Sequence, residues 1–409
     1  MAEVELRAGW LVAAGTALVA TTYGLARFTY GLFSPDFASE FDLSPLVVGV
    51  LGSGSYVGYC VAILGATALT PRWGARRVAV FAGATATIGI STVAASSSAV
   101  MLAIGLLVAG SSTGLASPPM AAAISRWISP ARKDQAQTLV NAGTGAGVLV
   151  SGPIALALMA HWRVAWAVFA LMSTLVTIVV WRCVPSDPRP EPPQTGPESG
   201  EPHGAGDLPA GTLRLLVCSA LMGMGSIAVW TLGRQAVVDQ GGTPRLAAIV
   251  WTIVGAAGIA GALAGHAVKL LGLTRSWVLG MTAMAAASVA LGLLADQPLL
   301  AAAAAAVFGA TYIALTGVLL VWATWLFPTR ASFGVGISFL LIAAGQAIAS
   351  PLASAGVGPL GLSGVFIACA GATGVGALLA PRRAMTVPPT RARPTTTSNA
   401  ATKGHPGVA

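Results

Sequence analysis

Two arginines lie inside long apolar runs of this sequence, and arginine is a residue type suited to binding an anion. Arg27 belongs to YGLARFTYGLF, residues 23–33, and Arg234 lies in a second run more than two hundred residues later. A charge at the centre of a bilayer costs about 2.5–3.5 kcal/mol, so it needs a compensating role. Because a guanidinium binds a carboxylate through two parallel hydrogen bonds, the two arginines predict a site for a small organic anion.

Aromatic residues accompany both arginines at helical spacing. Tyr23, Arg27 and Tyr30 are separated by four and three residues, which predicts that they share one face of a helix. Trp230 precedes Arg234 by four residues, so the pattern of an aromatic residue before an arginine occurs in both runs. We therefore expect both helices to present these side chains to a common cavity.

Anchoring is the alternative role for both arginines. Arg27 lies six residues before Phe33, about 9 Å along a helix, so its side chain could reach the outer membrane interface. Arg234 lies closer still to the end of its run. Asp36 or Asp239 would then neutralise these charges as an outer gate.

Further polar residues lie in the predicted helices and could line the same cavity. Each could instead pack in the core or form a hydrogen bond between helices. These candidates are Tyr56, Tyr59, Asn141, Tyr312 and Gln346.

The elements that position these residues are transmembrane helices. Of the 409 residues, 55% are hydrophobic and 9% are charged, whereas soluble proteins carry about 25% charged residues. The apolar runs are about 20 residues long, enough for a helix to cross a bilayer. An all-α integral membrane protein with twelve helices is predicted, over residues 9–33, 45–69, 77–96, 99–124, 135–159, 162–184, 212–237, 244–270, 274–295, 298–326, 331–354 and 360–381.

The chain divides at a segment rich in proline, glycine and acidic residues, which cannot bury apolar surface. We expect an amino-terminal six-helix bundle over 1–184, a flexible linker over 185–211 and a second six-helix bundle over 212–381. The tail over 382–409 is predicted to be disordered.

The two predicted bundles repeat each other. SPLVVGVLG from Ser44 matches TPRLAAIVW from Thr243, 199 residues later, and WISPAR from Trp127 matches WLFPTR from Trp325, 198 residues later. An offset this constant indicates a duplicated unit.

Basic residues predict the orientation. With both termini in the cytoplasm, 18 of the 22 Lys and Arg residues fall on the cytoplasmic side, as expected for a multi-pass protein of the cell membrane.

Several motifs resemble the major facilitator superfamily. The turn TPRWGARR resembles the basic turn between the second and third helices of that family, with Arg72, Gly74, Arg76 and Arg77 matching and Pro71 standing where the pattern has Asp. GSSTGLASP from 110 and SGP from 151 resemble its fourth and fifth helices. The pattern G-x-x-R-F-x-Y-G over 24–31 is similar to the YbfB/YjiJ-type bacterial branch. This resemblance implies the major facilitator fold, transport by alternating access, a substrate between the two bundles, and a gating role for the basic turn.

Other function classes lack their signatures. The sequence contains no G-K-[ST] phosphate loop, no H-E-x-x-H and no G-x-S-x-G, so neither an enzyme nor a cofactor or metal is expected. All 13 acidic residues fall in loops, the linker or helix edges. With these exclusions, the resemblance to the major facilitator superfamily implies a monomeric secondary transporter of a small solute, with an organic anion as the substrate, a proton as the candidate coupling ion and no nucleic-acid partner. The alternatives are an efflux pump for amphipathic drugs or metabolites, and a membrane sensor or scaffold.

Overall fold

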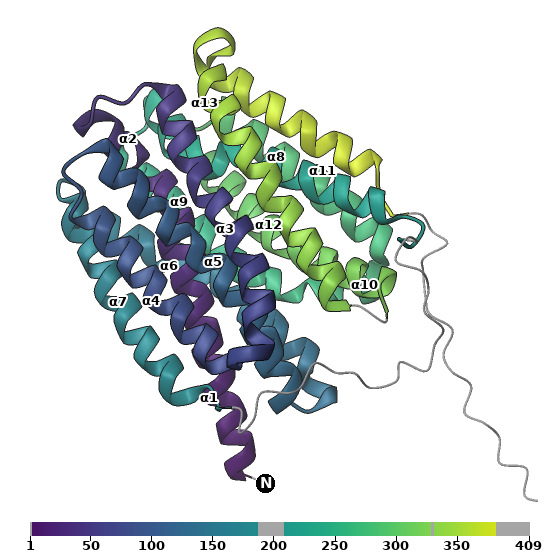
Figure 1. Ribbon diagram of the computed structural model, residues 1–409. Coiled ribbons are helices and arrows are strands. Elements are labelled where there is room, and N and C mark those ends of the chain that lie inside the picture. The colour runs from purple at the N-terminus through teal and green to yellow at the C-terminus, as the bar shows by residue number, and fades with distance from the viewer. Residues whose placement is uncertain (1, 187–207, 329–330, 382–409) are drawn as a thin grey trace, which may run out of the picture.

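Helices form nearly all of the described chain. The structure is a computed structural model that describes residues 2–186, 208–328 and 331–381 (Figure 1). Eleven helices in this part of the chain are long and apolar enough to cross a membrane. The last of them contains two predicted spans, because Gly361 adopts a positive φ of 69° and breaks the helix. The prediction of an all-α membrane fold is confirmed.

The part of the chain before residue 187 contains seven α-helices, one π-helix (η1) and one short 3-10 helix (η2). They are α1 (Ala2–Val19), η1 (Ala20–Phe28), α2 (Tyr30–Glu40), α3 (Pro45–Trp73), α4 (Ala75–Ala94), α5 (Ala99–Trp127), η2 (Pro130–Arg132), α6 (Lys133–Ala157) and α7 (Trp162–Cys183). The second part holds α8 (Thr212–Asp239), α9 (Pro244–Ile259), η3 (Ala260–Leu263), α10 (Ala264–Leu271), α11 (Leu273–Leu293), α12 (Pro298–Leu326) and α13 (Ala331–Leu378).

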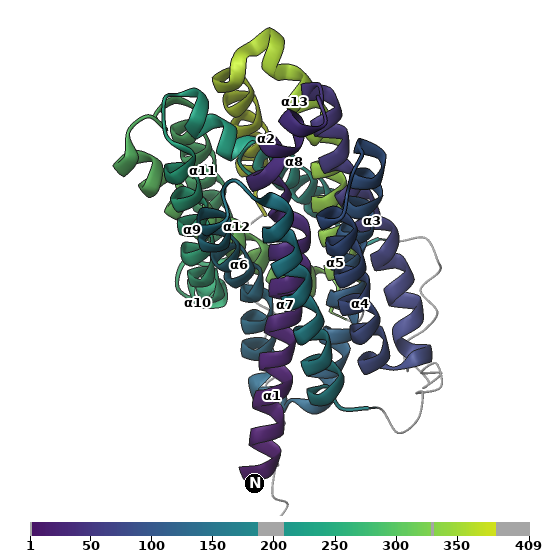
Figure 2. The same ribbon diagram turned by 90° about the vertical axis from the view of Figure 1, so that its left-hand side faces the viewer.

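The helices pack as two halves that meet along a central interface. In the first half α5 packs on α3 and α4, and α4 on α7; in the second, α13 packs on α8 and α11, and α12 on α9 and α11 (Figures 1 and 2). The halves meet where α3 lies against α13, α6 against α9 and α2 against α8. Most of the predicted linker and the whole predicted tail lie outside the described residues.

The sequence repeat has a counterpart in the backbone. Ser44 caps α3 by accepting a hydrogen bond from Val47 N–H, and Thr243 caps α9 in the same way from Leu246 N–H. Each cap is followed by a proline at the first helical position, where proline fits best. The turns after α3 and α10 also match, with φ 83° and ψ 154° at Gly74 and φ 81° and ψ 159° at Gly272. Positive φ at both turns favours glycine.

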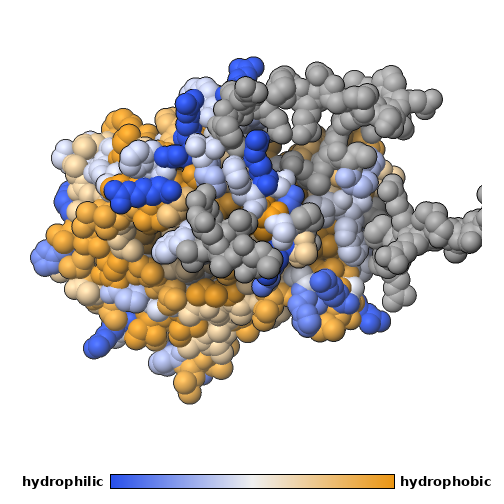
Figure 3. Space-filling model, turned by 90° about the horizontal axis from the view of Figure 1, so that it is seen from below, coloured by the Kyte–Doolittle hydropathy of each residue, from blue (hydrophilic) through white to orange (hydrophobic). Residues whose placement is uncertain are grey.

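The face at which α1 begins is polar. Seen from this side, hydrophilic side chains gather on the face and hydrophobic side chains cover the flanks (Figure 3). Most described basic residues belong to helix ends on this side: Arg72, Arg76, Arg77, Arg126, Lys133, Arg182, Arg214, Lys269 and Arg275.

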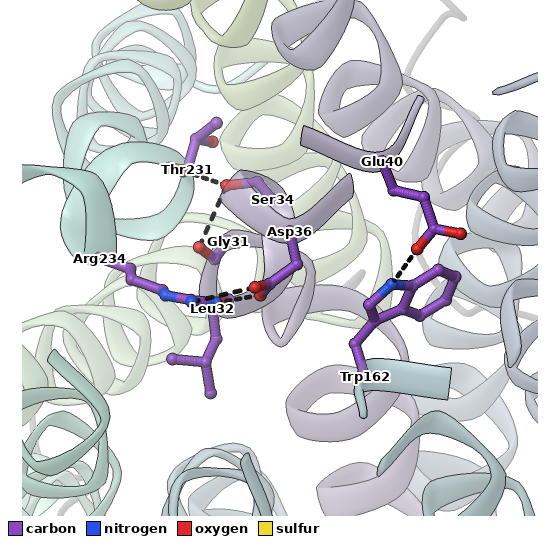
Figure 4. Close-up of polar contacts among 8 residues, drawn as sticks. All are labelled: Gly31, Leu32, Ser34, Asp36, Glu40, Trp162, Thr231 and Arg234. Atoms are coloured by element: carbon purple, nitrogen blue, oxygen red, sulfur yellow. Dashed lines mark hydrogen bonds and ion pairs between the residues drawn. The ribbon is translucent and has the colours of Figure 1, made fainter. Parts of the chain in front are cut away.

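The first membrane helix is longer than the sequence predicted. Helical structure continues through η1 and α2 to Glu40, so the predicted end at residue 33 is wrong. Pro35 has no N–H for the carbonyl of Gly31, and the Ser34 hydroxyl donates to that carbonyl instead, at 3.2 Å (Figure 4). Beyond the proline, Phe37 is fully buried with its ring centroid 4.9 Å from that of Trp162 on α7. This packing maintains the helix through a polar stretch.

The middle of this first helix is a π-helix, η1, which adds a residue to each turn. Both the N–H and the hydroxyl of Thr29 donate to the carbonyl of Gly24, five residues earlier, at 3.2 and 2.7 Å. Gly24 also lies against Gly147 of α6, where a Cβ on Gly24 would come within 2.4 Å of the Gly147 Cα. Two glycines therefore let α6 support η1 by close backbone contact.

A methyl group at Gly147 is expected to destabilise the protein. The Cβ of a Gly147→Ala variant would lie 2.0 Å from the carbonyl oxygen of Ala20, which only a backbone shift can relieve. Overpacking of this kind costs about 1–3 kcal/mol, so a melting temperature measured in detergent should fall by several degrees. Gly54→Ala is the matched control, because nothing lies within 4 Å of its added methyl. Equal melting temperatures for the two variants would contradict the close packing.

Candidate functional site

Arg27 lies deep inside the membrane-spanning part of η1, with only 5% of its surface exposed. Its guanidinium donates to Gln346 of α13 in the interior of the protein rather than to an exposed group. Of the two roles left open by the sequence, this contact favours the inward-facing one over anchoring.

The Arg27 guanidinium is only partly satisfied by hydrogen bonds. Its Nη2 donates to Oε1 of Gln346 on α13, at 2.6 Å, whereas its Nε is buried without any acceptor. No carboxylate among the described residues forms an ion pair with it. A buried cation without an anionic partner is costly, so this arrangement is suited to an anion that arrives from outside.

Aromatic rings surround the guanidinium. Its Cζ lies 4.5 Å from the ring centroid of Tyr56, 4.8 Å from Tyr59, 5.1 Å from Phe28 and 5.8 Å from Tyr23. Such distances give favourable cation–π contacts. The rings stabilise the charge without neutralising it, which leaves the guanidinium able to bind an anion.

A small cavity adjoins Arg27 at the interface between the two halves. Its volume is about 20 Å³, enough for one water molecule. Across it, Nδ2 of Asn141 on α6 donates to Oγ1 of Thr316 on α12, at 3.0 Å. The residues that line it are Tyr23, Arg27, Phe28, Tyr59, Asn141, Thr144, Tyr312, Ile313, Thr316, Phe339 and Ile342.

The second half contributes a polar cluster on the other side of Arg27. Nε2 of Gln346 lies 3.3 Å from Oγ of Ser226 on α8 and 3.2 Å from the hydroxyl of Tyr312 on α12. Trp230 stacks on Phe28 of the first half, with ring centroids 4.1 Å apart. The site is therefore built from residues of both halves.

Arg234 does not lie beside Arg27. It forms a bidentate ion pair with Asp36 of α2 and also donates to the carbonyl of Leu32, at 2.6 Å (Figure 4). The side chains of Arg234 and Asp36 are 15% and 23% exposed, so the ion pair is partly buried. The expectation that both arginines face one cavity is corrected by this contact: Arg234 joins α8 to α2 at the face opposite the start of α1.

Tyr30 also lies away from the cavity. Its hydroxyl donates to the carbonyl of Val48 on α3, at 2.6 Å, and its ring packs beside Phe37. The predicted shared face of Tyr23, Arg27 and Tyr30 assumed 3.6 residues per turn, but η1 is a π-helix. The wider turns rotate Tyr30 off the face that carries Arg27.

The predicted gating turn is a sharp connection between α3 and α4. Gly74 forms the turn and its N–H donates to the carbonyl of Thr70, while Arg72 lies in the last turn of α3. Cζ of Arg76 lies 5.7 Å from the Trp181 ring, and Arg77 continues α4. A gating role for these residues stays a prediction.

Ser226 shares the helix face of Trp230 and Arg234 at four-residue spacing, as the sequence indicates, and it reaches the site through its contact with Gln346. It follows Arg27 by 199 residues, the offset of the internal repeat. Asp36 and Arg234 are likewise 198 residues apart. Asp36 and Arg234 therefore pair directly, and Arg27 and Ser226 are linked through Gln346. The repeat offset was a signal for both pairs. Thr144, Thr316 and Phe28 carried no comparable signal.

An all-helical membrane protein with a buried cation between two groups of helices fits the class of solute transporters. The family comparison agrees. Residues 16–323 match the Major Facilitator Superfamily, and the chain belongs to that family.

Part of the chain is similar in sequence to two known proteins. The chain is 33% identical to human (Homo sapiens) Monocarboxylate transporter 11 over 204 residues, which span 46% of this chain and 41% of that protein. The mouse (Mus musculus) protein of the same name is 35% identical over 155 residues, 36% of this chain and 32% of the relative. The matched part therefore covers less than half of these relatives.

Two solved transporters share the fold. A bacterial homologue of the human lysosomal transporter Spinster, in an inward-facing and occupied conformation, gives a TM-score of 0.71 at 12% identity, covering 91% of this chain and 95% of that one. A mutant of the nucleoside transporter NupG gives 0.70 at 12% identity, covering 90% and 98%.

Proposed function

We propose that the protein transports small organic anions that carry one carboxylate, as a secondary active transporter, with Arg27 as the residue that binds the carboxylate. The observation that carries this proposal is the buried Arg27 guanidinium, which has an unpartnered Nε and no carboxylate among the described residues within ion-pair distance. A carboxylate could accept from Nε and Nη2 together, the geometry that guanidinium favours.

The charge of the site supports a monovalent substrate. Arg234 is neutralised by Asp36, so Arg27 supplies one free positive charge. The remaining polar groups near it are neutral: the hydroxyls of Tyr23 and Tyr312 and the amides of Asn141 and Gln346. A dicarboxylate would bring a second negative charge without a partner, at a high desolvation cost. The relatives named Monocarboxylate transporter 11 add independent support.

The orientation is also a proposal. The face at which α1 begins carries most of the basic helix ends, and basic residues favour the cytoplasmic side of a membrane. We infer that this face is cytoplasmic and that the protein lies in the cell membrane. The Arg234–Asp36 ion pair then closes the external side, so the substrate would exchange with the cytoplasm in this conformation.

Reconstitution into liposomes tests the proposed function. We expect saturable uptake of radiolabelled monocarboxylates such as propionate and benzoate, competed by each other. Succinate, a dicarboxylate, and cationic dyes should compete at least about tenfold less well, since each places a charge that the site cannot pair. Efflux of cationic dyes driven by a pH gradient, without monocarboxylate uptake, would contradict the proposal and favour a drug exporter.

A further inference from the structure

The Gln346 side chain is fully buried and links the two halves through Arg27. Its Oε1 accepts from Arg27 Nη2, and its Nε2 reaches Ser226 and Tyr312 of the second half. Gln346 itself belongs to α13, whereas Arg27 belongs to η1. One amide therefore holds the guanidinium of the first half against three helices of the second.

The amide oxygen lies where a carboxylate oxygen would bind. A hydrogen bond of 2.6 Å to a guanidinium is as short as a charge-assisted one. However, an amide offers one acceptor oxygen and no net charge, whereas a carboxylate offers two oxygens and a full charge. The consequence is visible at Nε of Arg27, which the amide leaves without an acceptor.

The space beside Arg27 does not admit a carboxylate in this conformation. The cavity of about 20 Å³ is the size of one water molecule, so a substrate needs room from a side chain that moves. The side chain already bound to Nη2 is that of Gln346. Its two contacts to Ser226 and Tyr312 are long, at 3.3 and 3.2 Å, and therefore weaker than the bond to Arg27.

We propose that Gln346 is a built-in substitute for the substrate: its amide occupies Arg27 in the empty transporter, and the incoming carboxylate displaces it. This inference rests on the proposed function. The displacement removes the hydrogen bond between Arg27 and α13, so binding of the anion loosens the two halves at the level of the site. Substrate binding is thereby coupled to the movement that alternating access requires.

The affinity of a Gln346 variant for propionate distinguishes this proposal from the simpler one, in which Gln346 is a ligand of the substrate. If Gln346 is a ligand, its removal weakens propionate binding; if it competes with the substrate for Arg27, its removal strengthens binding. Isothermal titration of the purified protein with propionate measures which of the two occurs. For Gln346→Ala we expect a dissociation constant roughly tenfold lower than that of the wild type, the effect of removing one charge-assisted hydrogen bond from the empty state.

Ser350→Ala is the matched control. The Ser350 hydroxyl also bonds across the halves, to the carbonyl of Gly49 at 2.9 Å, but it does not touch Arg27. Its dissociation constant for propionate should stay within about twofold of the wild type. If Ser350→Ala tightens binding as much as Gln346→Ala does, a general weakening of the interface explains the result and the proposal is overturned.

A second variant gives a readout that does not depend on the Ala variant. Glutamate in Gln346→Glu has the same shape and an ionised carboxylate, which would pair with Arg27 permanently. Propionate binding at neutral pH should fall by at least about 100-fold.

The outcomes separate the two proposals. If the wild type binds propionate but Gln346→Ala binds it more weakly, the role of Gln346 as a substitute for the substrate is overturned and the proposed function stands. Unchanged propionate binding in Gln346→Glu also overturns only the role of Gln346. A wild-type protein that binds no monocarboxylate overturns the proposed function and this inference together.

Discussion

Replacing Arg27 by glutamine is expected to reduce monocarboxylate uptake into liposomes by at least about 100-fold. A bidentate, charge-assisted pair in a buried site contributes on the order of 3 kcal/mol, and 1.4 kcal/mol corresponds to a factor of ten. Arg27→Lys should retain more transport than Arg27→Gln, since the charge remains but the planar pair of donors is lost.

The stability of Arg27→Gln distinguishes a binding residue from a structural one. Removing the guanidinium loses its bond to Gln346 and its ring contacts, but it also removes the cost of a buried charge without a carboxylate partner, so the melting temperature of the empty protein should change little. Removing a structural arginine would lower it. A fall of several degrees, together with lost uptake, would mean that the variant damages the fold rather than the site.

Breaking the ion pair between Arg234 and Asp36 should open the face opposite the start of α1. The pair is bidentate and partly buried, and it joins α8 to α2, so each single variant leaves a charge without its partner. Arg234→Gln or Asp36→Asn should therefore shift the population toward the open state by roughly tenfold or more.

Cysteine labelling measures this shift. Ser34 is 4% exposed and bonds the carbonyl of Thr231 across the same contact, so Ser34→Cys reports on opening. In a background without native cysteines, a membrane-impermeant maleimide should label it roughly tenfold faster once the ion pair is broken. The exchanged pair, Asp36→Arg with Arg234→Asp, is the control and should restore slow labelling. Equal rates in all of these proteins would show that the pair does not hold this face closed.

The fold was accessible from the sequence because it depends on long, redundant signals. Apolar runs, cap residues and the repeat each act over many positions, and most helix ends were predicted within a few residues. The first helix shows the limit. Its polar end after Phe33 predicts a loop, yet burial of Phe37 against Trp162 extends the helix to Glu40. That tertiary packing cannot be read from local sequence.

The site was only partly accessible. A lone arginine in an apolar run marked Arg27, but the same reasoning grouped it with Arg234 because both follow an aromatic residue. The repeat offset instead relates Arg27 to Ser226 and Asp36 to Arg234. The structure joins Asp36 to Arg234 directly and links Arg27 to Ser226 through Gln346. Tyr30 was misplaced for a different reason, since no sequence pattern predicted the π-helix that rotates it away.

Binding of propionate to the purified wild-type protein and to Arg27→Gln tests the central claim most directly. Isothermal titration should give saturable binding of one propionate per wild-type chain, and an affinity for Arg27→Gln weaker by at least about 100-fold. Equal affinities of the two proteins for propionate would contradict the claim that Arg27 binds the substrate's carboxylate.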